Sequence, residues 1–186
     1  VYVLHSRAVA FLESKKDWVA KQLEKVPETT KICDGAKITF LGTEYKIENI
    51  PNARRGVWIE DSYIFVSGEP EFLNRRVKDF FKVEVRKYLS SKARYYANKT
   101  GKKFSKITVK DTTSRWGSCA SNGSIAFSWR LGFAPLFVID YIVAHEVAHL
   151  SEMNHSIKFW KLVKEICDSD VDEAQKWLLK NGIYLY

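Results

Sequence analysis

Cysteine is scarce in this chain of 186 residues, and its number is odd, because only Cys33, Cys119 and Cys167 occur. Three widely spaced cysteines are typical of free thiols in a reducing compartment, so we exclude a secreted, disulfide-stapled framework and expect a cytoplasmic protein. Proline and glycine are also few, with four and nine residues. This composition excludes a long disordered or low-complexity region and favours a folded protein with a hydrophobic core.

Long apolar runs are missing as well. The longest candidate, over residues 129–150, is interrupted by five polar or charged side chains: Arg130, Asp140, His145, Glu146 and His149. A membrane span does not readily tolerate so many ionisable groups, so we expect no transmembrane helix and no membrane partner. The chain opens with Val1 rather than Met, and we leave open what precedes it in the natural protein.

Acidic residues are rare in one segment. The formal net charge is +8, yet residues 73–110 alone carry thirteen lysines and arginines against two acidic residues, a local balance of +11, while the rest sums to −3. This excess is larger than solubility requires and raises the hypothesis of nucleic acid bound through residues 73–110. The simpler interpretation is the solvated face of a long helix. The contacts expected for nucleic acid include Arg75, Arg76, Lys82 and Arg86.

Hydrophobic spacing divides the chain into helices and short strands. A helical period covers residues 6–25, 70–98, 136–150, 156–167 and 171–180. Alternation predicts hairpins that pair 37–41 with 44–50 and 57–60 with 63–67, and single strands over 106–110 and 124–129. Residues 112–122 carry turn residues and are expected to form a loop.

These elements predict an α+β fold. The segment 136–150 is apolar on nearly every face, so it should be a central, buried helix beside a small antiparallel sheet. An N-terminal helix and β-hairpins precede it. We expect residues 1–69 to form this N-terminal region and residues 70–186 to form the domain that holds the buried helix, with both in one compact unit.

Histidine is scarce, yet three of the four histidines fall within eleven residues: His145, His149 and His155. On a helix, positions 145 and 149 lie one turn apart on the same face, so both imidazoles can reach one tetrahedral metal ion. Glu146 stands beside them and is placed to take a proton from a metal-bound water, which is the division of labour in HExxH metallohydrolases. The simpler interpretation is that the HExxH spacing arose by chance. However, burying unpaired histidine and glutamate side chains on an apolar helix costs free energy, which favours a metal site.

His155 supplies a third nitrogen if the helix ends near residues 152–154 and the chain turns back. Its spacing from His149 equals that in the metzincin pattern HExxHxxGxxH, but Glu152 stands where that pattern has its glycine. Asn154 tolerates the left-handed backbone region and could provide the reversal instead. Three histidines with an open position are typical of a catalytic zinc site, so we expect one Zn²⁺ per chain. The alternative third ligand is a distant carboxylate, Glu165 or Glu173.

Several short sequence motifs cluster between residues 106 and 160: RWGSC at 115–119, WRL at 129–131, HEVAH at 145–149, MNHS at 153–156 and FW at 159–160. Together with residues 14–19 and 41–45 upstream, this set resembles the YgjP-like metal-dependent hydrolases over the whole chain. The resemblance implies a zincin-type zinc metallopeptidase, related to the SprT-like and WLM groups, with a zincin-like metallopeptidase domain over 70–186. It implies zinc at His145, His149 and His155 and a catalytic Glu146.

Arg115 and Ser118 lie in the first of these motifs, RWGSC at 115–119. Either could bind substrate or support the negative charge that develops on oxygen during hydrolysis. The simpler interpretation is that Arg115 pairs with a helix carboxylate such as Asp140. Cys119 could be a fourth ligand or a nucleophile, but a buried free thiol is simpler because three histidines already complete a catalytic zinc set.

The favoured function is hydrolysis of a peptide or protein substrate through a metal-activated water. Zinc polarises the carbonyl and lowers the water pKa, while Glu146 takes the proton and later delivers it to the leaving amine. The strand over 124–129 could be the sheet edge that aligns the extended peptide. The competing function is a SprT-like protease or zinc-containing binding module that acts at DNA or RNA, which salt-dependent DNA binding without hydrolysis would favour.

Overall fold

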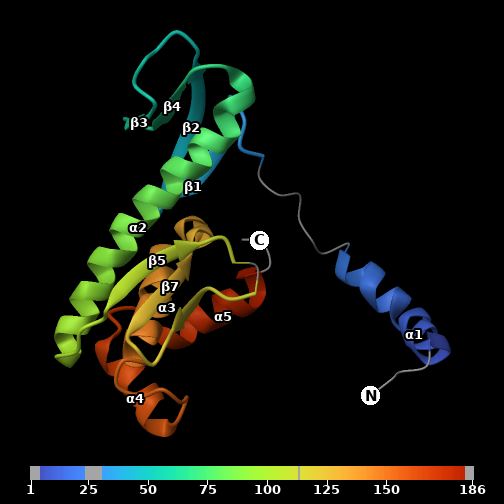
Figure 1. Ribbon diagram of the computed structural model, residues 1–186, viewed down its shortest axis with the longest axis vertical. Coiled ribbons are helices and arrows are strands. Elements are labelled where there is room, and N and C mark those ends of the chain that lie inside the picture. Colours follow the sequence, from blue (N-terminus) through green and yellow to red (C-terminus); the bar gives the residue numbers. More distant parts are fainter. Residues whose placement is uncertain (1–4, 24–30, 113, 183–186) are drawn as a thin grey trace.

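The computed structural model (Figure 1) describes residues 5–23, 31–112 and 114–182. The first helix, α1 (His5–Leu23), agrees with the helix expected over 6–25, of which residues 24–25 lie outside the described residues. Its side chains from Arg7 to Ala20 are all exposed, including Phe11 and Trp18. None of the described helices is long and apolar enough to cross a membrane.

The first sheet is built from the two expected hairpins. Strands β1 (Lys37–Phe40) and β2 (Thr43–Ile50) pair antiparallel, as do β3 (Val57–Glu60) and β4 (Tyr63–Ser67). A parallel pairing of β2 with β4 joins the hairpins in the order β1-β2-β4-β3. Alternate apolar side chains face inward and are buried, namely Ile38, Phe40, Ile47, Ile64 and Val66.

The long helix α2 (Leu73–Thr100) connects the two halves of the fold, after a short 3₁₀ turn η1 (Pro70–Phe72). Its buried stripe recurs every four residues: Leu73, Val77, Phe81, Val85, Leu89, Ala93 and Ala97. Four residues advance an α-helix by about 400°, so the stripe rotates by about 40° per step. The first half of α2 therefore packs on the first sheet, and the second half packs on the second sheet and α3 (Figure 1).

The second sheet has three strands, β5 (Lys106–Lys110), β6 (Gly117–Cys119) and β7 (Ser124–Ser128), in the order β5-β7-β6. Strand β7 pairs parallel with β5 and antiparallel with β6, so the sheet is mixed and the expectation of an antiparallel sheet was wrong. The strand expected to be the edge, β7, is central. Strand β6 lies in the expected loop, because three residues without a hydrophobic period carry no strand signal.

The remaining helices surround the site. After a 3₁₀ turn η2 (Trp129–Phe133) come α3 (Leu136–Ala148), α4 (Ile157–Ile166) and α5 (Val171–Asn181). Helix α3 is central, as expected, and ten of its thirteen residues are buried. The α+β class is therefore confirmed, with small sheets beside a buried helix. One cluster of buried side chains includes residues on both sides of position 70, and the division at that position stays a prediction.

Candidate metal centre and its surroundings

Three imidazoles converge at the end of α3. His145 lies in the last turn of α3, His149 follows as its C-terminal cap, and His155 returns just before α4. Their ligand-capable atoms all lie within 4.8 Å of one another, and Nε2 of His145 is 3.1 Å from Nε2 of His155. Three nitrogens at such separations can each reach one ion at zinc–nitrogen distances of about 2.1 Å.

The chain returns to His155 without a left-handed residue. After α3, the amides of Leu150 and Ser151 donate to carbonyls three residues back, which tightens the last turn. Asn154 has no positive φ, so the expectation that it supplies a left-handed reversal was wrong. Its Oδ1 instead accepts from the amide of Ser156 at 3.3 Å, and Ser156 in turn caps α4. A turn built on side-chain acceptors therefore replaces the glycine of the metzincin pattern.

The surroundings orient His149 and lower the pKa values of His145 and His149. Nδ1 of His149 lies 3.0 Å from the carbonyl oxygen of Glu152, so this nitrogen donates and Nε2 keeps its lone pair. The buried ring of Phe159 stacks on His149 with centroids 4.5 Å apart and meets His145 and His155 edge-on. Burial, together with the two neighbouring imidazoles, lowers the pKa of His145 to about 4. A neutral imidazole is the form that binds a metal ion.

Glu146 points from α3 toward the second sheet and is 5% exposed. Burial raises its pKa to about 8, against the opposing charge of Arg115. Its Oε2 is buried and has no hydrogen-bond partner among the described residues. A carboxylate with such a pKa is suited to exchange a proton near neutral pH.

Gly117 provides the space for the Glu146 side chain. A Cβ atom at position 117 would lie 2.5 Å from Oε1 and 2.6 Å from Cγ of Glu146, and these distances are too short for any side chain. Gly117 has no positive φ, so the position needs glycine for space and not for backbone conformation. From the sequence, Gly117 was expected only to fix packing and Phe159 had no assigned role, although both stand in the motifs that carried the resemblance.

Among the described residues, β6 pairs only with β7, which leaves the outer edge of the second sheet free beside this carboxylate. Ser128 N donates to Trp116 O at 2.8 Å, Ala120 N donates to Ser124 O at 2.9 Å, and Ser118 pairs with Ala126 between them. In an antiparallel pair, alternate residues turn their N–H and C=O groups to the partner strand. The backbone groups of Gly117 and Cys119 therefore point to the free edge, and β6 contacts α3.

The structure also shows the surroundings of the other residues that the sequence singled out. Asp140 does not pair with Arg115, because its partner is Lys92 at 2.9 Å, so that expectation was wrong. Arg115 is exposed and acts electrostatically on Glu146. The Cys119 thiol is half-buried, and burial and the charge of Glu146 raise its pKa to about 11, which argues against a thiolate nucleophile. Within the described ranges, the metal-binding group includes neither alternative ligand, Glu165 or Glu173.

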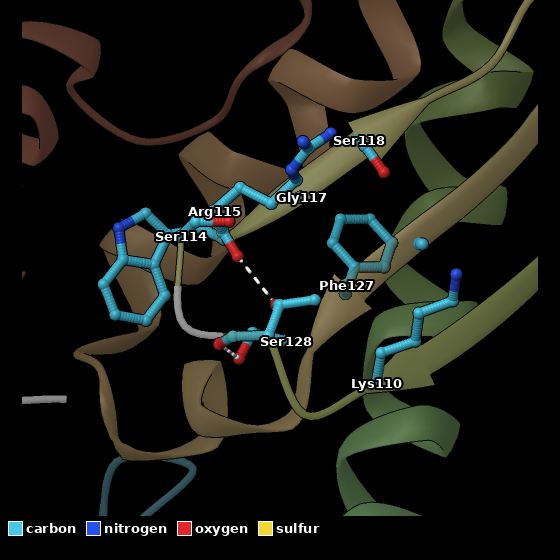
Figure 2. Close-up of a pocket in the computed structure, with 10 residues that line it drawn as sticks. Lys110, Ser114, Arg115, Gly117, Ser118, Phe127 and Ser128 are labelled. Carbon is cyan, nitrogen blue, oxygen red and sulfur yellow. Dashed lines mark hydrogen bonds between the residues drawn. The ribbon is translucent and has the colours of Figure 1, made fainter. Parts of the chain in front are cut away.

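An open pocket of about 280 Å³ lies over β6 and β7 (Figure 2). The ten lining residues come from the loop before β6, from β6 and β7, and from the end of β5. Arg115 and Ser118, the two predicted substrate-binding residues, both line it, whereas the three histidines do not. Gly117 connects the pocket with the metal centre, because it lines the pocket and also contacts Glu146 beside the histidines.

Of three comparisons with known proteins, the match to a family model identifies the family. No curated protein matches the chain. A solved structure, the metallopeptidase zymogen abylysin of Pyrococcus abyssi, aligns with a TM-score of 0.45 and 18% identity over 50% of this chain and 95% of that chain. The model of the YgjP-like metallopeptidase domain matches residues 3–181. The chain therefore belongs to the YgjP-like family of metallopeptidase domains, and its family implies a bound metal ion.

Proposed function

We propose that this chain is a zinc-dependent peptidase in which His145, His149 and His155 hold one Zn²⁺ and Glu146 is the general base. The observation that carries the proposal is the convergence of three imidazoles within 4.8 Å, next in sequence to a buried carboxylate. Three nitrogen donors leave a fourth position of a tetrahedral ion open, as in catalytic zinc sites.

The donor set fits zinc in chemistry as well as in number. Histidine nitrogens suit Zn²⁺ better than they suit Mg²⁺ or Ca²⁺, which prefer oxygen ligands. The Glu152 carbonyl, by accepting from Nδ1 of His149, orients that ring as an outer-shell partner does in known zinc sites. When bound, zinc would polarise the scissile carbonyl and lower the pKa of water at the open position.

Glu146 would then move the proton. Its buried carboxylate accepts a proton from the attacking water and delivers it to the leaving amine. The carboxylate is confined between α3 and the backbone of Gly117, so its position is defined before substrate arrives. A peptide paired with the free backbone groups of Gly117 and Cys119 would lie along β6, with Arg115 and Ser118 as substrate-binding side chains.

Two substitutions separate zinc binding from catalysis. His149→Ala should sharply lower zinc content, measured by elemental analysis, because a three-ligand site does not readily become a two-ligand one. Glu146→Gln should keep the zinc and lose turnover on any peptide that the wild type hydrolyses. The matched control is Glu165→Gln on the exposed face of α4, which should keep both zinc and turnover. Unchanged zinc in the first variant, or unchanged turnover in the second, would reject the assignment.

A second candidate function, nucleic-acid binding, is favoured by a stripe on α2. Lys78, Lys82, Arg86 and Arg94 flank the buried stripe at multiples of four residues and so wind around the helix with it. Arg86 and Arg94 are exposed and form no ion pair with any described residue. The guanidinium of Arg76 is half-buried and donates to the Ser67 carbonyl, so we leave Arg76 out of the proposed surface.

Salt dependence tests this candidate. Affinity for duplex DNA should fall log-linearly with salt, with a slope of about −0.9 per neutralised phosphate. The double reversal Arg86→Glu with Arg94→Glu should flatten the slope and leave zinc content intact. If DNA does not bind at low salt, or if the charge reversal leaves binding unchanged, the nucleic-acid hypothesis is wrong. The stripe is then simply a solvated helix face.

A further inference from the structure

The pocket over the second sheet carries two cations and no carboxylate. Lys110 and Arg115 line it together with hydroxyl groups and the small side chains of β6 and β7. Figure 2 shows Arg115 and Ser118 at one end of the pocket and Lys110 at the other. The zinc site proposed above does not use Lys110, and the pocket lies outside the group of histidines.

Strand register explains why these side chains share one face. Lys110 is paired with Ser128, and Ser118 is paired with Ala126, so all four side chains project to the same side of the sheet. The opposite side carries the buried Ile125 and Phe127 and faces α2 and α3. Small residues form the floor on the outer side, and long cations stand at its margins.

Neither cation has a close carboxylate partner in the described part of the chain, although Arg115 acts electrostatically on Glu146. Among the residues that the structure describes, Lys110 and Arg115 form no ion pair. The nearest acidic residue along the chain, Asp111, instead pairs with Arg130 at 3.0 Å. Two hydroxyl groups are already used inside the loop, because Thr112 donates to the Arg115 carbonyl at 2.8 Å and Ser128 to the Thr112 carbonyl at 3.5 Å. An anionic ligand would therefore meet two positive charges that have no ion-pair partner among the described residues.

The pocket stands where a substrate side chain would point. A peptide added at the β6 edge places every second side chain on the outer face of the sheet. Gly117 separates this face from Glu146, so the pocket adjoins the bond to be cleaved. We propose that Lys110 and Arg115 bind a carboxylate of the peptide substrate, so that acidic peptides are the preferred class. The carboxylate is either an Asp or Glu side chain or the C-terminal group.

This inference rests on the proposed function for its peptide, but binding can be measured without catalysis. The probe is zinc-loaded Glu146→Gln protein with fluorescent alanine-based decapeptides that carry Glu or Gln at each position in turn. Each peptide is made with a free and an amidated C-terminus. Measured by fluorescence anisotropy, the peptide with Glu at one position should bind about tenfold more tightly than the peptide with Gln there. Alternatively, peptides with a free C-terminus should bind about tenfold more tightly than amidated ones. The two arms distinguish a side chain from a terminal carboxylate.

Lys110→Met in the same background should abolish that preference. The matched control is Lys106→Met, which removes an exposed lysine from the same face of β5 but outside the pocket lining, and it should keep the preference. Equal affinity in all peptide pairs, no binding at all, or a preference that survives Lys110→Met would overturn the inference. Wild-type cleavage of the same peptides separates the two proposals. Selective binding without cleavage would contradict the peptidase alone, and cleavage without a carboxylate preference would contradict the pocket alone.

Discussion

Replacing Gly117 by alanine tests how closely catalysis depends on the position of Glu146. The new Cβ would lie 2.5 Å from Oε1, 2.6 Å from Cγ and 2.8 Å from Cδ of Glu146. Ordinary contact begins at 3.4 Å, so the two groups must separate by about 0.9 Å, the difference between 3.4 and 2.5 Å. Because Gly117 has no positive φ, alanine adds this collision and no backbone strain.

The expected cost falls on the chemical step. A misplacement of about 1 Å lowers turnover by about 10²-fold, which corresponds to about 2.7 kcal/mol in the activation free energy. Zinc content should stay at the wild-type level, because the atoms nearest to the new methyl group belong to Glu146 and not to a histidine. The assay compares kcat on a fluorogenic peptide with zinc measured by elemental analysis and with the thermal unfolding midpoint.

Gly182→Ala is the matched control. Its new Cβ would meet the Trp116 ring at 3.6 Å or more, which is an ordinary contact, and its φ of −56° suits alanine. This variant should keep wild-type kcat. A Gly117→Ala protein with wild-type kcat would refute the reasoning, and so would one whose lost activity follows from lost zinc or from unfolding.

Two further predictions concern the surroundings of the metal centre. Phe159 is fully buried against all three imidazoles, so Phe159→Ala should lower the free energy of unfolding of the zinc-free protein by about 3 kcal/mol or more. Urea denaturation measures the loss, Phe159→Leu should lose less, and an unchanged midpoint would contradict the packing. Burial and the charge of Glu146 hold the pKa of Cys119 at about 11, so only about 10⁻³ of this thiol is ionised at pH 8. Iodoacetamide labelling followed by mass spectrometry should therefore detect the exposed Cys33 first. The labelling rate of Cys119 should rise about tenfold with each pH unit up to pH 11. Equal labelling of both thiols at pH 8 would contradict a raised pKa of Cys119.

Local features of the chain were predictable because their causes are local. Periodicity predicted both hairpins of the first sheet and the long helix α2, since neighbouring residues alone set those patterns. The helical repeat brings positions 145 and 149 to one face, and a six-residue interval limits how far His155 can lie from them. The grouping of the three imidazoles follows from these short intervals, and their role as zinc ligands stays a proposal.

Only the tertiary structure decided which partners lie far apart in sequence. Strand β6 exists because β7 pairs with it, although three residues without a period carry no signal of their own. Three contacts join segments whose separation along the chain follows no helical or strand period. They are Gly117 with Glu146, Lys92 with Asp140, and Arg76 with the Ser67 carbonyl. Lys110 and Arg115 share a pocket because β5 and β6 flank the same central strand. Such contacts depend on how sheets and helices pack, and packing is a property of the whole chain.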